Sequence, residues 1–140
     1  MCLLARYDPA GVLRWSRSFG THASFSSISI NPEGLILLTG SFEKTVDFGL
    51  GELVSAGGFD LFAAILTSDG YPLWAARYGD PRHQFLVRGT YGLDGSIVLA
   101  GSFHGTIDFG TGALTASGYD GFSEGSEDAF LVIFEEASRT

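Results

Sequence analysis

The chain has 140 residues, of which 45% are hydrophobic and 14% aromatic, so its composition is that of a globular rather than a disordered protein. Eight basic residues stand against sixteen acidic ones, for a formal charge of −8, and this excludes the basic stripe that nucleic-acid binding needs. No apolar run approaches the roughly 20 residues that span a bilayer, and residues 1–8 reach Arg6 and Asp8 too early for a signal-peptide core, so neither segment is expected in this chain.

The first 61 residues contain short apolar runs separated by turn residues, without a sustained helical period. These runs predict strands at residues 3–7, 12–18, 25–30 and 35–42, the last continuing through residues 45–48. Twenty glycines and a single lysine, Lys44, also favour a turn-rich β protein, because exposed helix faces normally carry Lys, Glu and Gln. The lone Cys2 excludes an internal disulfide.

The same pattern then returns. GSFEKTVDFG at residues 40–49 reappears 61 residues later as GSFHGTIDFG, and Trp15 aligns with Trp74. This second copy predicts strands at residues 62–66, 72–78, 85–91 and 96–103, with a continuation through residues 106–109. A third copy opens with a strand at residues 129–134. A unit of this length cannot bury its own faces and must stack on its neighbours.

Four antiparallel strands in about 60 residues, repeated in tandem, are typical of a β-propeller blade. The sequence therefore predicts an all-β partial β-propeller with two four-stranded antiparallel blades plus the first strand of a third. The blade-like repeats are expected at residues 1–61 and 62–129, with the truncated third repeat at residues 130–140. A chain that stops one strand into a repeat is expected of a piece cut from a longer array of such repeats.

A family resemblance follows from these residues. The Gly-Ser-Phe-x-x-Thr-x-Asp-Phe-Gly stretch, the Gly-Gly-Phe-Asp turn at residues 57–60 and Gly-x-x-x-Trp at residues 70–74 resemble the bacterial β-propeller repeats called SBBP. DGSIVLAGS at residues 94–102 is similar to the related delta-60 repeats. The resemblance implies multi-bladed propellers in large bacterial proteins that are often exported or on the cell surface, most of them without an assigned activity.

These observations favour a non-catalytic scaffold, whose partners are further repeats of the same kind or a second copy, with protein or glycan as other possible ligands. Two blades cannot close a ring, so open sheet faces predict self-association or marginal stability. The first alternative is a lectin-like propeller in which Trp15 and Trp74 stack on sugar rings, although one large residue per repeat is more typical of core. The second is a fragment of a propeller hydrolase, which would need Asp47 and Asp108 to converge.

An acidic insertion in the second copy offers oxygen ligands for Ca²⁺. It lacks the spacing of an EF-hand loop, so a solvated surface loop is favoured and no other cofactor is expected. Asp60 and Asp120 follow Gly-Phe and Gly-Tyr, and we interpret both as turn formers. The candidate metal ligands are Asp120, Glu124, Glu127 and Asp128.

The two Asp-Phe-Gly tripeptides, beginning at Asp47 and Asp108, match the kinase metal-binding tripeptide but lack the nucleotide loop, strand lysine and catalytic loop that accompany it. They predict turns in which Asp accepts backbone hydrogen bonds and Gly takes a positive φ. His22 and His83 are repeat-equivalent but have no cysteine or paired carboxylate near them in sequence, so they do not predict a zinc site. No catalytic constellation is recognisable.

Overall fold

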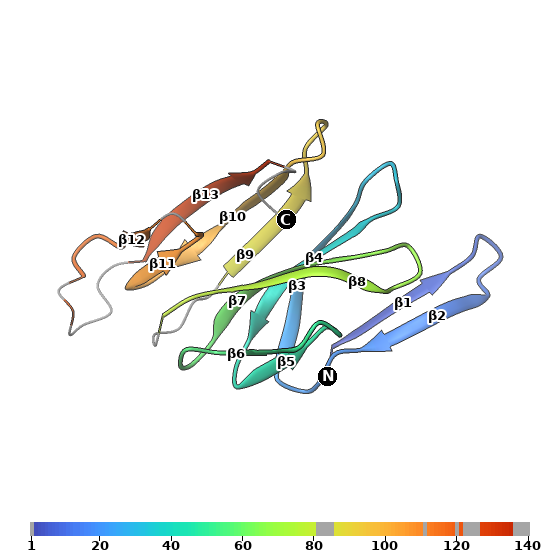
Figure 1. Ribbon diagram of the computed structural model, residues 1–140, viewed down its shortest axis with the longest axis horizontal. Helices are drawn as coiled ribbons and strands as arrows, with labels where there is room; N and C mark the ends of the chain where they lie inside the picture. The colour runs from blue at the N-terminus through green and yellow to red at the C-terminus, as the bar shows by residue number, and fades with distance from the viewer. Residues whose placement is uncertain (1, 81–85, 111, 120, 122–126, 136–140) are drawn as a thin grey trace.

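The computed structural model describes residues 2–80, 86–110, 112–119, 121 and 127–135. Every regular element in these residues is a β-strand, which confirms the all-β prediction (Figure 1). The strands in chain order are β1 (Leu3–Tyr7), β2 (Leu13–Ser18), β3 (Ala23–Ile30), β4 (Ile36–Phe42), β5 (Thr45–Asp47), β6 (Glu52–Val54), β7 (Asp60–Leu66), β8 (Pro72–Tyr78), β9 (Leu86–Tyr91), β10 (Ile97–Phe103), β11 (Thr106–Asp108), β12 (Ala113–Thr115) and β13 (Asp128–Phe134).

The predicted turns form between the predicted strands. After β1, the Asp8 carboxylate accepts hydrogen bonds from the backbone N–H groups of Ala10 and Val12, each at 2.9 Å. Asn31 does the same after β3, accepting from the N–H groups of Glu33 and Leu35. Asp and Asn favour such turns because their short side chains bond the backbone a few residues on.

The strand predicted to run on through residues 45–48 is instead a separate hairpin, β5–β6, and β11–β12 repeats it in the second copy. The break lies at Lys44, which has a φ of 60°, and at its equivalent Gly105, with a φ of 66°. A left-handed residue cannot continue an extended strand. Two positions that differ in sequence thus share one conformation.

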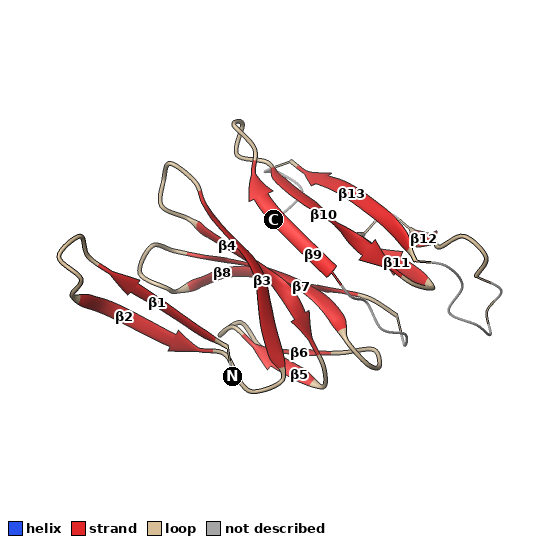
Figure 2. Ribbon diagram, turned by 180° about the vertical axis from the view of Figure 1, so that it is seen from behind, coloured by secondary structure: helices blue, strands red, loops and turns tan. Residues whose placement is uncertain are grey.

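Three larger antiparallel sheets stack as layers (Figures 1 and 2). The first layer is β1–β2, the middle layer has the order β3-β4-β7-β8, and the third layer has the order β9-β10-β13. The described strands therefore do not form one four-stranded sheet per sequence copy, and the predicted propeller blades stay a prediction. β13 also joins the third layer and does not start another sheet.

The boundaries between layers do not coincide with the boundaries between sequence copies, because the chain passes from one layer to the next in the middle of each copy. β2 pairs with β1 alone among the described strands, and Gly20, with a φ of 101°, then directs the chain into the middle layer. The middle layer consequently takes β3 and β4 from the first copy and β7 and β8 from the second. The predicted boundary at residues 61 and 62 falls inside β7.

The repeat nevertheless sets the register. β1 pairs with β2 as β7 pairs with β8, and both pairs have an irregularity at the same place, after Arg6 and after Ile65. The rings pack alike as well: the Phe62 centroid lies 4.9 Å from that of Phe48, and the equivalent Phe130 lies 5.0 Å from Phe109. The two sequence copies therefore build two equivalent sets of contacts.

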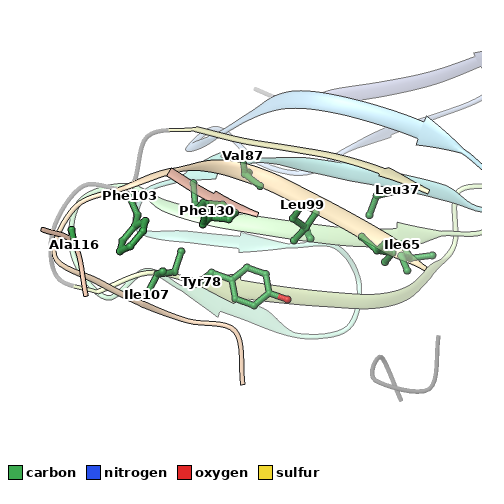
Figure 3. Packing of buried hydrophobic residues seen from close by; sticks show 12 residues of the cluster. Leu37, Ile65, Tyr78, Val87, Leu99, Phe103, Ile107, Ala116 and Phe130 are labelled. Carbon is green, nitrogen blue, oxygen red and sulfur yellow. The ribbon is translucent and has the colours of Figure 1, made fainter. Parts of the chain in front are cut away.

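The two central strands of the middle layer, β4 and β7, are covered on both faces, and every residue of β7 is buried. Successive strand residues point to opposite faces, so β4 and β7 contribute to two separate cores. The core facing the first layer contains Leu4, Phe19, Ile36, Leu38, Phe62, Ala64 and Leu66. The core facing the third layer contains Leu37, Leu61, Ala63, Ile65, Tyr78, Val87, Leu99 and Phe130 (Figure 3).

The middle and third layers also meet along β3 and β9. Here hydrogen bonds between serine hydroxyls and backbone N–H groups take the place of backbone-to-backbone hydrogen bonds. The Ser27 hydroxyl accepts from the Gly89 N–H at 2.9 Å, and the Ser29 hydroxyl accepts from the Tyr91 N–H at 3.3 Å. A Cβ at Gly89 would lie 2.7 Å from the Thr39 methyl group. Glycine and serine thus allow these two strands to approach closely.

Candidate functional site

The candidate sugar-stacking residue Trp15 lies between two layers. Its indole N–H donates to the backbone oxygen of Ser68 at 3.0 Å, and Arg6 donates to the same oxygen at 2.8 Å. The ring covers Gly70 so closely that a Cβ there would lie 2.9 Å from it. Trp15 therefore attaches the first layer to the β7–β8 turn.

Its equivalent, Trp74, packs against the core between the middle and third layers. Both tryptophans are partly buried, and neither reaches the half-exposure that a sugar-binding platform would require. Their place between stacked layers is that of packing residues.

A cationic group sits beside Trp15. The Arg17 guanidinium carbon lies 5.8 Å from the centre of the Trp15 ring and 5.2 Å from that of Tyr71, within the range of a cation–π interaction. The same guanidinium donates to the Asp69 backbone oxygen at 3.4 Å. These contacts further connect the first layer to the β7–β8 turn. Sequence reasoning missed them because Arg17 and Tyr71 are far apart in the chain.

The aspartates of the two Asp-Phe-Gly tripeptides accept hydrogen bonds from backbone N–H groups of the turns that they begin. Asp47 accepts from the N–H groups of Gly49 at 2.7 Å and Gly51 at 3.3 Å, and Asp108 accepts from the equivalent Gly110 and Gly112. The tripeptide glycines, Gly49 and Gly110, have φ values of 108° and 115°. The turn interpretation is confirmed.

A buried ion pair between Asp60 and Arg77 was not predicted from the sequence. Asp60 is completely buried, and its carboxylate accepts from Arg77 at 2.7 Å and from the Ala56 N–H at 2.9 Å. Burial raises the pKa of the Asp60 carboxyl, and the hydrogen bonds from Ala56 and Arg77 oppose this shift. The other carboxylate oxygen, Oδ1, has no hydrogen-bond partner. Asp60 thus holds the turn before β7 through Ala56 and is also paired with Arg77 as a buried ion pair, which the sequence did not predict.

The acidic insertion lies partly outside the described residues, and this includes Asp120 and Glu124. Glu127 is exposed, whereas Asp128 accepts from the N–H and hydroxyl of Ser117, each at 3.0 Å. Asp128 begins β13 as Asp60 begins β7, so it is Asp128, and not Asp120, that matches Asp60. The described residues contain no group of three or more His, Cys, Asp or Glu side chains that would hold a metal.

Cys2 precedes β1, and His22 precedes β3. Cys2 is a buried free thiol, and burial raises its pKa, which disfavours the reactive thiolate. His22 lies beside the hairpin, where its backbone oxygen accepts from Glu43. His83 lies outside the described residues.

A groove of about 530 Å³ opens between the β3–β4 turn and the β9–β10 turn. It is lined by hydroxyl and acidic side chains, including Ser29, Glu33, Thr90 and Asp94. Hydrogen bonds from Ser96 hold the pKa of Asp94 below its usual value, so this carboxylate is charged near neutral pH. The groove has the chemistry to attract a cation or a hydroxyl-rich ligand, but it contains no catalytic pair.

The described residues include no helix with the length and apolar character needed to span a bilayer. No protein-family model matches the chain, and no curated protein matches it either.

Proposed function

We propose that this chain is a non-catalytic segment of β-propeller repeats that acts as a structural or protein-interaction scaffold. The middle layer supports the proposal, because its order β3-β4-β7-β8 is that of a four-stranded propeller blade. On this interpretation the first layer is the outer half of one blade, and the third layer is three strands of another. The resemblance to SBBP repeats would imply that such a scaffold is part of a larger bacterial surface or exported protein.

The observation that carries the proposal is the repetition of the interface between layers. Phe62 packs toward the first layer as Phe130 packs toward the middle layer, and Phe48 and Phe109 occupy equivalent places. The close approach of β3 to β9 also agrees with blades that converge toward a common axis. A scaffold in which each unit contacts only its neighbours gains stability with every unit added.

The two alternatives receive less support. A lectin-like surface needs open tryptophans, whereas the Trp15 indole N–H is occupied by Ser68. A hydrolase site needs convergent carboxylates, whereas Asp47 and Asp108 are each held in a local turn.

Lengthening the chain by one repeat tests the proposal. Residues 67–134, added a second time after Phe134, supply the fourth strand of the third layer and one further layer. We expect the urea midpoint of unfolding to rise while the transition stays cooperative, because the added layer covers an apolar face. An added repeat that unfolds separately, or that leaves the midpoint unchanged, would contradict the scaffold proposal. A tail of the same length made of Gly and Ser serves as the control.

A further inference from the structure

The third layer has an apolar face that no described residue covers. On β13, Leu131 and Ile133 are 70% and 60% exposed, on the side opposite the buried Phe130. Their equivalents in the middle layer are Ala63 and Ile65, and both are buried beneath the third layer. The open face of β13 is thus equivalent to the face of β7 that the third layer covers.

The first layer has the opposite open face. On β1, Leu3 and Tyr7 are 56% and 61% exposed. Their equivalents in β7 are Phe62 and Leu66, which are buried against the first layer. The open face of β1 is therefore the kind of surface that packs onto a preceding layer.

The interfaces inside the chain show how such faces fit. The side of β7 with Ala63 and Ile65 belongs to the core that also contains Phe130 of β13. The opposite side of β7 shares a core with Leu4 of β1. In each case one face of a layer meets the other face of its neighbour, so the two open faces are complementary to each other and not to themselves.

We propose that a second copy of this chain stacks head to tail on the first, with the open face of its β1 against the open face of β13. Leu3 and Tyr7 of one copy would then cover Leu131 and Ile133 of the other. This inference rests on the proposed scaffold function and names its partner. Because different patches meet, the contact is heterologous, and each dimer keeps one open face of each kind.

Sedimentation velocity of the full chain over a wide range of concentration tests the proposal. We expect species that grow past the dimer as concentration rises. The double variant Leu131→Lys/Ile133→Lys should be monomeric, and so should Leu3→Lys/Tyr7→Lys. An equimolar mixture of the two should form a one-to-one dimer and nothing larger, because each variant keeps the face that the other lacks.

Leu50→Lys is the matched control, since this exposed leucine lies in the β5–β6 turn on neither face, and it should assemble like the unaltered chain. Circular dichroism checks that each variant is folded, and serine replaces lysine at the same positions in any variant that is not. A monomeric unaltered chain, a face variant that still self-associates, or a mixture that stays monomeric would overturn the proposal. If the lengthened chain is nevertheless stabilised, only the contact between copies is refuted.

Discussion

Replacing Phe62 by alanine should lower the free energy of unfolding by about 3–5 kcal/mol, the usual loss for a buried phenylalanine. Phe62 is completely buried, and its ring contacts those of Phe48 and Phe25, at centroid distances of 4.9 and 6.1 Å. The cavity would open in the middle layer, where covering layers on both sides limit relaxation. Urea unfolding followed by circular dichroism measures the loss.

The equivalent Phe130→Ala variant is the matched control. Phe130 has the same strand position and ring neighbours of the same kind, but it lies in the third layer, which is covered on one side. We expect a smaller loss, about 2–3 kcal/mol, because an outer layer can collapse into the cavity more easily. Equal losses, or a larger loss for Phe130→Ala, would show that Phe62 is not at the centre of the stack.

Replacing Arg77 by methionine should cost about 2–3 kcal/mol at neutral pH. The change leaves the Asp60 carboxylate buried without its counter-charge, and breaking a fully buried pair typically costs about 3–5 kcal/mol. The expected loss is lower because the Arg77 side chain is 35% exposed and partly screened by water. The double variant Asp60→Asn/Arg77→Met should recover part of the loss, since no charge remains buried. Strictly additive losses would contradict a direct interaction.

The same pair predicts a pH dependence. Because burial raises the pKa of Asp60 above its ordinary value of 3.8, the folded chain binds the proton more tightly than the unfolded chain. The stability that Asp60 contributes is complete below pH 3.8 and is lost as the pH rises through its folded pKa. Arg77 lowers the pKa of Asp60, so this pKa should be higher in the Arg77→Met variant. The variant should therefore lose stability over a wider pH range than the unaltered chain. Unfolding of this variant and of the double variant, measured at a series of pH values, checks this prediction. The difference between their free energies of unfolding should vanish as Asp60 becomes protonated.

The strands could be predicted from the sequence because each is a local pattern. Residues 3–7 and 72–78 were placed at their observed bounds, and the aspartate turns followed from known turn chemistry. β6 was missed because ELV is short and follows a Gly-Leu-Gly turn, and because Lys44 gives no sign in sequence that its φ is positive.

The grouping of strands into layers could not be predicted in the same way. A repeat has the same length wherever its first residue is placed, so its period does not reveal where one sheet ends. The pairings of Trp15 with the Ser68 turn and of Asp60 with Arg77 depend on that grouping or on contacts between neighbouring strands. The candidate sites therefore changed more than the strands did.

Residue-resolved hydrogen exchange measures the layers most directly. We expect the amides of β4 and β7, buried on both faces, to exchange only through global unfolding, while β1 and β2 exchange faster and together. β9 and β10 should form a group separate from β7 and β8. The opposite grouping, with β1 to β4 opening as one unit and β7 to β10 as another, would show that the sequence copies, and not the stacked layers, are the structural units.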